Sequence, residues 1–151
     1  MVEMPILPIC ALTWYLPASR RLFPIKIFPL SERTGKWGAQ DHVLFQRLMK
    51  DLKEEKQKEP FLKLVQTSSS HEPFEVPFHR LYDKILNSFA YADSCVGDFV
   101  KQYQETPLWK NTLFVLVPDH QGAYPYPIEN PLDGQTIPLI LIGGAINNPW
   151  L

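Results

Sequence analysis

The sequence predicts an α/β fold in which a mostly parallel sheet is flanked by helices. Three stretches support this prediction: an uncharged run at 113–117, a long helical pattern at 78–105 and a short strand pattern at 61–67. An apolar run bounded by turn residues is typical of a strand buried on both faces, as the strands of parallel sheets are. Strand, helix and strand in this order predict a right-handed βαβ unit over residues 61–117.

The first 27 residues differ in composition and pattern from the rest of the chain. They are apolar without a helical or alternating period, and prolines stand at positions 5, 8, 17 and 24. Proline lacks a backbone N–H and disfavours both helix interiors and central strands. We therefore expect residues 1–27 to form an irregular lead-in that need not belong to the fold, which we expect over residues 28–148.

A surface helix is expected to begin at Asp41. This residue follows a polar stretch with two glycines, and its carboxylate suits a helix N-cap. The apolar residues that follow recur at helical spacing and leave Lys and Glu on the opposite face. These apolar residues are Leu44, Phe45, Leu48 and Leu52. Pro60 then ends the helical pattern.

The short strand expected at 61–67 runs directly into three serines and His71. If this strand is parallel to the run at 113–117, His71 opens onto the same sheet edge as the residues after Val117. Simple exposure to solvent is the alternative for a single loop histidine. The serines do not form the G-x-S-x-G turn of serine hydrolases, so we do not assign them a nucleophilic role.

The long helical pattern at 78–105 carries one apolar seam. Its members recur at alternating spacings of three and four residues, which suits a helix laid across a sheet. They are Ile85, Phe89, Ala92, Val96, Phe99 and Tyr103. Pro107 ends the pattern. The aromatic residues of the seam are expected to fill the core.

The main chemical signal follows the run at 113–117, where Pro118 precedes Asp119 and His120. Open α/β sheets bind ligands beyond the carboxyl ends of their strands. A carboxylate and a neutral imidazole can both bind a divalent ion, at about 2.0–2.2 Å for zinc. Two ligands do not complete such a site. The alternative is that Asp119 caps the next turn and His120 is merely exposed.

The last part of the chain combines a long loop and a final strand. Residues 121–136 are polar and rich in proline, and loops of this length are usually functional or mobile. Residues 137–142, IPLILI, predict another strand, which Gly143 and Gly144 close.

Composition excludes two classes of partner. With 15 basic and 16 acidic residues the net charge is −1, so nothing indicates binding to nucleic acid or to a charged membrane surface. No run reaches the roughly 18 apolar residues of a membrane helix. We therefore expect no nucleic-acid partner and no membrane segment in this chain.

Four stretches stand together in a recognisable order. They are SHEPF at 70–74, Tyr91-Ala92-Asp93, the turn and strand at 109–120, and IPLILIGG at 137–144. In this combination the chain resembles the sulfatase-like branch of the alkaline phosphatase superfamily, and within it the bacterial lipoteichoic acid synthase and phosphoglycerol transferase family. The resemblance covers residues 28–146. It implies an alkaline phosphatase-like or sulfatase-like fold, with residues 28–148 as part of a catalytic domain.

The resemblance also implies roles for individual residues. Asp119 and His120 match a metal-ligand pair for a divalent ion such as Mn, Zn, Mg or Ca. His71 matches a histidine that contacts the phosphate or sulfate ester substrate. Trp37 and Gly38 belong to a KWG-x-x-D element to which we assign no chemistry. Members of this family act outside the cytoplasm, commonly behind N-terminal membrane helices.

One departure from the family bears on activity. The family needs a nucleophilic Thr, or a modified Cys or Ser, and an acidic metal ligand near its first strand, and residues 1–27 match neither. We therefore expect a fragment of a metal-dependent enzyme for sulfate or phosphate esters, with an incomplete metal site and no activity alone. The alternative is a non-catalytic binding or interaction module that has kept the fold.

Overall fold

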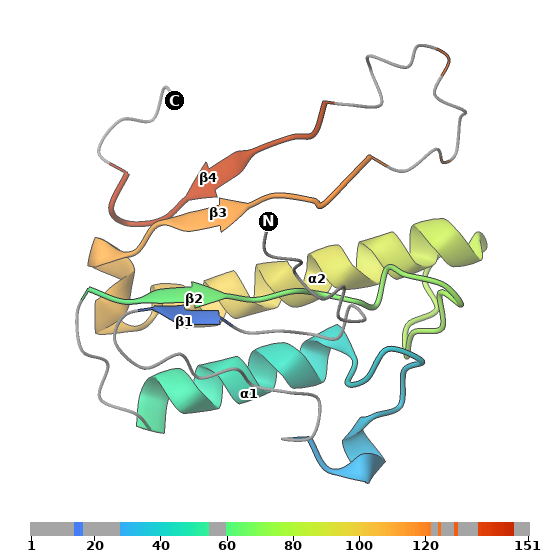
Figure 1. Ribbon diagram of the computed structural model, residues 1–151, viewed down its shortest axis with the longest axis horizontal. Coiled ribbons are helices and arrows are strands. Elements are labelled where there is room, and N and C mark those ends of the chain that lie inside the picture. The colour runs from blue at the N-terminus through green and yellow to red at the C-terminus, as the bar shows by residue number, and fades with distance from the viewer. Residues whose placement is uncertain are drawn as a thin grey trace, which may run out of the picture. The chain divides into compact units, whose positions relative to one another are not determined.

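The computed structural model of the chain describes residues 14–16, 28–54, 60–121, 124, 129 and 136–146. The chain divides into two compact units, Met1–Lys101 and Gln102–Leu151. The elements, labelled in part in Figure 1, are β1 (Trp14–Leu16), η2 (Leu30–Glu32), α1 (Asp41–Glu54), β2 (Leu62–Leu64), α2 (Lys84–Gln104), η3 (Pro107–Asn111), β3 (Phe114–Leu116) and β4 (Ile140–Ile142). In the described residues, no helix is both long and apolar enough to cross a membrane.

The first unit holds a two-stranded antiparallel sheet. β1 pairs with β2 so that Trp14 faces Leu64 and Leu16 faces Leu62. β1 lies inside the stretch for which the sequence predicts no regular structure. The other residues of that stretch, 1–13 and 17–27, lie outside the described residues, and the boundary expected after residue 27 stays a prediction.

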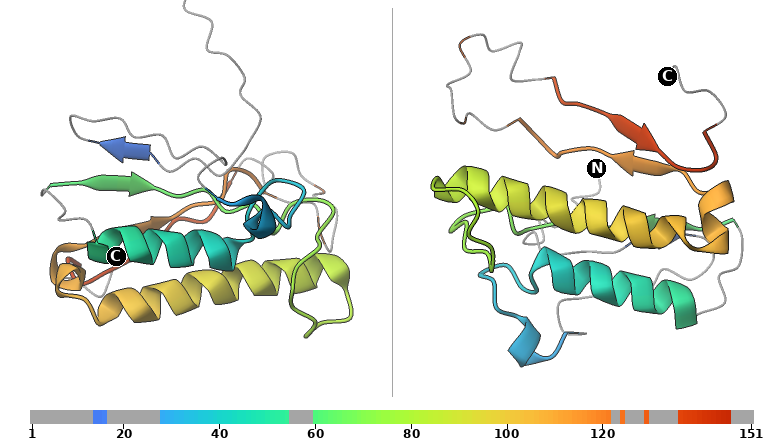
Figure 2. Two further views of the ribbon diagram at one scale, coloured as in Figure 1. Left: turned by 90° about the horizontal axis from the view of Figure 1, so that it is seen from below. Right: turned by 180° about the vertical axis from the view of Figure 1, so that it is seen from behind.

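Helices α1 and α2 pack side by side, as all three views show (Figures 1 and 2). The ring of Phe45 stacks on Phe99 with centroids 5.1 Å apart, and His42 contacts Tyr91. Residue numbers rise together along both helices at these contacts, so the two helices run in the same direction. The buried face of α2 includes Tyr91, Cys95 and Phe99, which are all at least nine-tenths buried. The predicted seam is therefore only partly correct, because Phe99 and Tyr103 are buried but Phe89 is 38% exposed.

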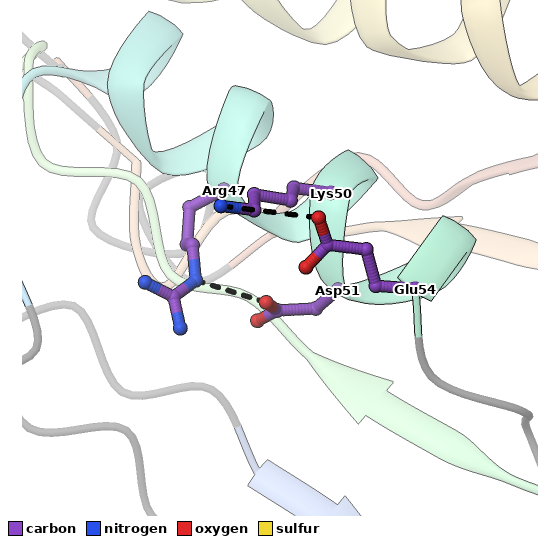
Figure 3. Close-up of polar contacts among 4 residues, drawn as sticks. All are labelled: Arg47, Lys50, Asp51 and Glu54. Atoms are coloured by element: carbon purple, nitrogen blue, oxygen red, sulfur yellow. Dashed lines mark hydrogen bonds and ion pairs between the residues drawn. The ribbon is translucent and has the colours of Figure 1, made fainter.

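Two ion pairs lie on α1 away from its contacts with α2, each between residues four positions apart (Figure 3). Arg47 Nε lies 2.9 Å from Asp51 Oδ1, and Lys50 Nζ lies 3.9 Å from Glu54 Oε1. Pairs of this kind contribute roughly 0.3–0.5 kcal/mol each. The stability of α1 therefore comes mainly from its buried stripe, which includes Leu44, Leu48 and Leu52.

Helix α2 begins at Lys84, six residues later than the pattern predicts. Asp83 caps it by accepting hydrogen bonds from the amides of Ile85 and Leu86, both at 2.9 Å. The side chain of Asn87 accepts from the amides of Arg80 and Leu81, both at 3.0 Å. These side chains offer the backbone partners outside the helix, so residues 78–83 form a loop instead of a first turn.

The second unit is a β3–β4 hairpin with η3 at its base. Phe114 pairs with Ile142 and Leu116 with Ile140, in antiparallel register. Tyr103 meets the ring of Phe114 edge-on at 5.0 Å. At the end of β4, Gly143 adopts φ +144°, and a Cβ there would lie 2.1 Å from the carbonyl oxygen of Thr112. Only glycine fits this close approach.

Two expectations about the sheet differ from the structure. Both described pairings are antiparallel, so the parallel sheet that the sequence predicts is not present among the described residues. The run at 113–117 is also not buried on both faces, because Leu113, Val115 and Val117 are each more than half exposed. Within the second unit, aromatic side chains cover Phe114, and no described side chain buries the alternate residues.

Candidate functional site

His71 lies in the loop that joins β2 to α2. The amide of His71 donates to Ser68 O at 3.1 Å, and the amide of Phe74 donates to His71 O at 2.9 Å, so the chain makes two successive turns here. The Glu72–Pro73 peptide is cis, and Phe74 adopts φ +59°. A bulky residue in this left-handed region costs of order 1–3 kcal/mol, and such strain gathers at functional sites. The rest of the unit must hold this loop in place.

Asp41 provides the deepest anchor of the loop. Its side chain is fully buried, and Oδ1 accepts hydrogen bonds from the amides of Ser68 at 3.0 Å and Ser69 at 3.2 Å. The amide of Asp41 donates in return to Ser69 Oγ at 2.9 Å. The first residue of α1 therefore binds the loop in both directions, and its carboxylate accepts from the loop amides in place of the helix amides that the predicted N-cap would bind.

A second anchor comes from the KWG-x-x-D element. Trp37 Nε1 donates to the carbonyl of Glu72 at 2.7 Å, and Gln40 Nε2 donates to the carbonyl of Glu75 at 2.9 Å. Ser69 Oγ donates to Gln40 Oε1 at 2.9 Å. Between the element and the loop lies a cavity of about 20 Å³, which is room for roughly one water molecule.

The ring of His71 is exposed at the surface of this arrangement. Its centroid lies 4.6 Å from that of Trp37, with the ring planes inclined by 61°. Its Nδ1 lies 3.2 Å from the carbonyl oxygen of Glu72. The imidazole thus has a defined neighbour on one side and open solvent on the other, which suits a group that contacts a ligand.

Asp119 and His120 lie in the second unit, just past β3. Their side chains are 72% and 76% exposed, and Asp119 Oδ1 lies 3.8 Å from His120 Nε2. Two ligands about 2.1 Å from a tetrahedral ion lie roughly 3.4 Å apart, so the pair fits two positions around one ion with little adjustment. His120 Nδ1 lies 3.1 Å from the carbonyl of Gln121, which can only accept, so Nε2 keeps the lone pair that a metal needs.

No third ligand joins this pair among the described residues, where no group of three or more His, Cys, Asp or Glu could hold an ion. The donor types fit a divalent metal, and their number does not complete a site. His71 belongs to the first unit and the pair to the second. The shared sheet edge that the sequence predicts for them stays a prediction.

The comparisons with known proteins identify the family. The family model described as sulfatase matches residues 10–149 of this chain, which is more than half of it. The chain belongs to the sulfatase family. It is thus a sulfatase-like member of the alkaline phosphatase superfamily, as the motifs in its sequence indicate, and the α/β class of its fold follows from that membership.

A curated relative agrees with this placement. Lipoteichoic acid synthase-like YvgJ of Bacillus subtilis (strain 168) is 25% identical over 114 residues, which cover 68% of this sulfatase-family chain and 18% of that protein. The chain therefore spans less than a fifth of the relative's length. No solved structure matches the chain.

In this sulfatase-family chain, Tyr91 of the Tyr91-Ala92-Asp93 element has a structural role. The Tyr91 hydroxyl meets His42 Nδ1 at 2.5 Å and joins α2 to α1. Burial raises the pKa of Tyr91 well above its usual range, and the neighbouring Cys95 raises it further. Burial also raises the pKa of the Cys95 thiol. Both groups therefore stay neutral at ordinary pH and act as core residues.

Sequence reasoning missed the function of two residues, Trp37 and Asp41. It assigned no chemistry to the KWG-x-x-D element and gave Asp41 only a capping role. The structure brings both to the His71 loop, across about 30 residues of sequence. The sequence did contain one signal for this role, a Trp-Gly turn followed four residues after the tryptophan by an acid. A turn beside a buried carboxylate can hold another loop through hydrogen bonds.

Proposed function

We propose that this chain is part of a metal-dependent, sulfatase-like catalytic domain that acts on sulfate or phosphate esters outside the cytoplasm. In this proposal Asp119 and His120 supply two ligands of a divalent ion, and His71 contacts the sulfate or phosphate group. Sulfatase-family proteins are generally metal-dependent, which supports an ion at this pair.

The observation that carries the proposal is the arrangement of Asp119 and His120. Their candidate ligand atoms are 3.8 Å apart, and both side chains are open to solvent. The hydrogen bond to Gln121 O leaves His120 Nε2 as the free nitrogen. A carboxylate beside an imidazole suits an ion of Zn²⁺ or Mn²⁺ type better than Mg²⁺ or Ca²⁺, which prefer all-oxygen sites.

The chemistry divides between the ion and the protein. A divalent ion at this site would supply positive charge to stabilise the charge that develops on the ester oxygens. Asp119 and His120 would hold the ion through Oδ1 and Nε2. His71, on its anchored loop, would bind an ester oxygen by donating a hydrogen bond from Nε2 when that nitrogen carries a proton.

We propose further that the chain is inactive alone. Sulfatase-like chemistry needs a nucleophile at a helix N-terminus, and the α-helices of the described residues begin at Asp41 and Lys84. A two-ligand site also holds its ion weakly, because ligand number and rigidity set affinity. Added Mn²⁺ should therefore bind without producing turnover.

A titration of the ¹⁵N-labelled chain with Mn²⁺ tests the metal site. The paramagnetic ion should broaden the signals of residues 119–121 first, and Asp119→Ala should abolish this selective broadening. Glu105→Ala, which removes an exposed carboxylate elsewhere in the second unit, should leave it unchanged. Broadening that is equal in Asp119→Ala and in the unaltered chain would rule out this ion site.

Turnover of p-nitrophenyl sulfate and p-nitrophenyl phosphate, with and without Mn²⁺, tests inactivity. We expect no release of p-nitrophenol above the buffer rate. Metal-dependent turnover that is lost in Asp119→Ala would confirm the ester chemistry and refute the proposed inactivity.

A second function, a binding or interaction module that has kept the fold, is favoured by one observation. The β3–β4 hairpin exposes apolar side chains in both strands and in the residues beside them, including Val115 at 52%, Val117 at 54% and Leu139 at 61%. Exposed apolar strand surface is a common feature of interaction sites. Sedimentation of the purified chain tests this alternative, because a defined complex would support it and a monomer at high concentration would count against it.

A further inference from the structure

One backbone carbonyl in the candidate site accepts two side-chain hydrogen bonds. The oxygen of Glu72 lies 2.7 Å from Trp37 Nε1 and 3.2 Å from His71 Nδ1. A carbonyl oxygen has two lone pairs and no proton, so it can serve both donors and can only accept. The hydrogen bond to His71 therefore requires the proton to be on Nδ1.

Trp37 is held where it can fix this carbonyl. Gly35 and Gly38 exchange backbone hydrogen bonds at 2.9 and 3.1 Å and place Lys36 and Trp37 at the tip of a two-residue turn. Gly38 adopts φ +127°, a conformation that other residues rarely take. The backbone that carries the indole is thus a short, closed turn, and the bond from Nε1 to Glu72 O, at 2.7 Å, holds the ring against the His71 loop.

The two rings also restrict each other. Their centroids are 4.6 Å apart in an edge-to-face arrangement, within the range of favourable aromatic contacts. A flip of the His71 ring would break the bond from Nδ1 to Glu72 O and disturb this contact. The indole therefore acts on His71 twice, through the shared carbonyl and through the ring edge.

We propose that Trp37 is a positioning residue that fixes the tautomer of His71, so that the neutral ring carries its proton on Nδ1 and leaves Nε2 as the nitrogen that takes up a proton. The identity of the ligand of His71, a sulfate or phosphate ester, rests on the proposed function. The tautomer itself rests only on the geometry of Trp37, Glu72 and His71.

The fixed tautomer decides which atom of His71 exchanges protons. In the neutral ring Nε2 holds the lone pair, so a proton taken up by His71 goes to Nε2. The resulting Nε2–H can donate to an ester oxygen while Nδ1–H remains on Glu72 O. Without Trp37 the proton would divide between the two nitrogens, and part of the population would take up a proton on Nδ1 instead of Nε2.

Long-range ¹H–¹⁵N spectra of the full ¹⁵N-labelled chain test the proposal directly. In alkaline buffer, where imidazoles are neutral, the shifts of the two ring nitrogens distinguish a protonated nitrogen from a bare one. The signals of His71 among the four histidines are assigned by their loss in His71→Gln. We expect a protonated Nδ1 and a bare Nε2 in the unaltered chain.

Trp37→Phe keeps an aromatic edge and removes the indole N–H. We expect the two nitrogen shifts of His71 to move toward each other, as in a mixture of tautomers. Trp109→Phe, in η3, is the matched control and should leave His71 unchanged.

Two results would overturn the proposal: a proton on Nε2 in the unaltered chain, or unchanged shifts in Trp37→Phe. The first needs no variant, so the test stands even if Trp37→Phe fails to fold. Failure of Mn²⁺ to bind at Asp119 and His120 would reject the proposed function and leave this measurement unaffected.

Discussion

The loop of His71 and the loop of Asp119 and His120 both present a histidine and an acidic side chain. They differ in how many hydrogen bonds from the rest of the protein hold them in place. The His71 loop is bound by Asp41, which is fully buried, and by Trp37 and Gln40. Asp119 and His120 are both more than 70% exposed. Their described hydrogen bonds reach only themselves and Gln121.

This difference indicates which of the two loops is preorganised. In the first unit, buried hydrogen bonds fix the loop before any ligand arrives, and they offset the strained backbone at Phe74. In the second unit, the pair has ligand atoms at a suitable spacing without a shell of supporting contacts. A bound metal ion would hold Asp119 and His120 in place, as buried side chains hold the loop of His71.

Asp41→Ala should have the largest effect and tests the preorganised loop of His71. It leaves the amides of Ser68 and Ser69 without their acceptor in a buried place. Hydrogen bonds to a charged group contribute about 1.5–3 kcal/mol each, so the loss of both should lower the free energy of unfolding by about 3–6 kcal/mol. Urea denaturation followed by circular dichroism measures this change.

Two variants control the Asp41 measurement. Asp41→Asn keeps an oxygen acceptor and should lose less stability than Asp41→Ala. Glu54→Ala, also in α1, removes only an exposed pair with Lys50 and should cost no more than about 0.5 kcal/mol. If Asp41→Ala and Glu54→Ala have equal effects, the carboxylate is not the anchor of the His71 loop.

Gly143→Ala should have the next largest effect and tests the base of the second unit. At φ +144° a Cβ would clash with Thr112 O, and backbone strain of this kind costs about 1–3 kcal/mol. Thermal unfolding should show the loss. Gly97→Ala is the matched control, since nothing lies within 4 Å of its Cβ and helix α2 should gain up to about 1 kcal/mol. Equal effects of the two changes would contradict the close approach at Gly143.

The fold illustrates what local pattern can and cannot predict. Helix α1 begins at Asp41 as predicted, because an apolar stripe at helical spacing is a local signal, but the Asp41 carboxylate binds the amides of Ser68 and Ser69 and does not cap the helix. The antiparallel pairing of β1 with β2 is not predicted, because the prolines of the lead-in argue against any strand and β1 is only three residues long. The exposure of Val115 also escapes prediction, since an apolar run looks the same whether or not another element covers it.

The candidate site shows the same division. Asp119, His120 and His71 were predicted from motifs, and their roles stay proposals. Their surroundings were not predicted, because Trp37 and Asp41 act on the His71 loop across about 30 residues of sequence. Hydrogen bonds from side chain to distant backbone leave no periodic pattern, so only the folded chain reveals them.

Asp119→Ala should have the smallest effect on stability and gives the sharpest contrast with Asp41→Ala. The chemical change is the same, but this side chain is 72% exposed and its oxygen accepts only from the next amide, at 3.0 Å. Surface changes of this kind usually stay within about 0.5 kcal/mol. The same urea experiment, without metal, measures it. A loss as large as that of Asp41→Ala would mean that the protein supports Asp119 through contacts of its own, and the contrast between the two loops would no longer hold.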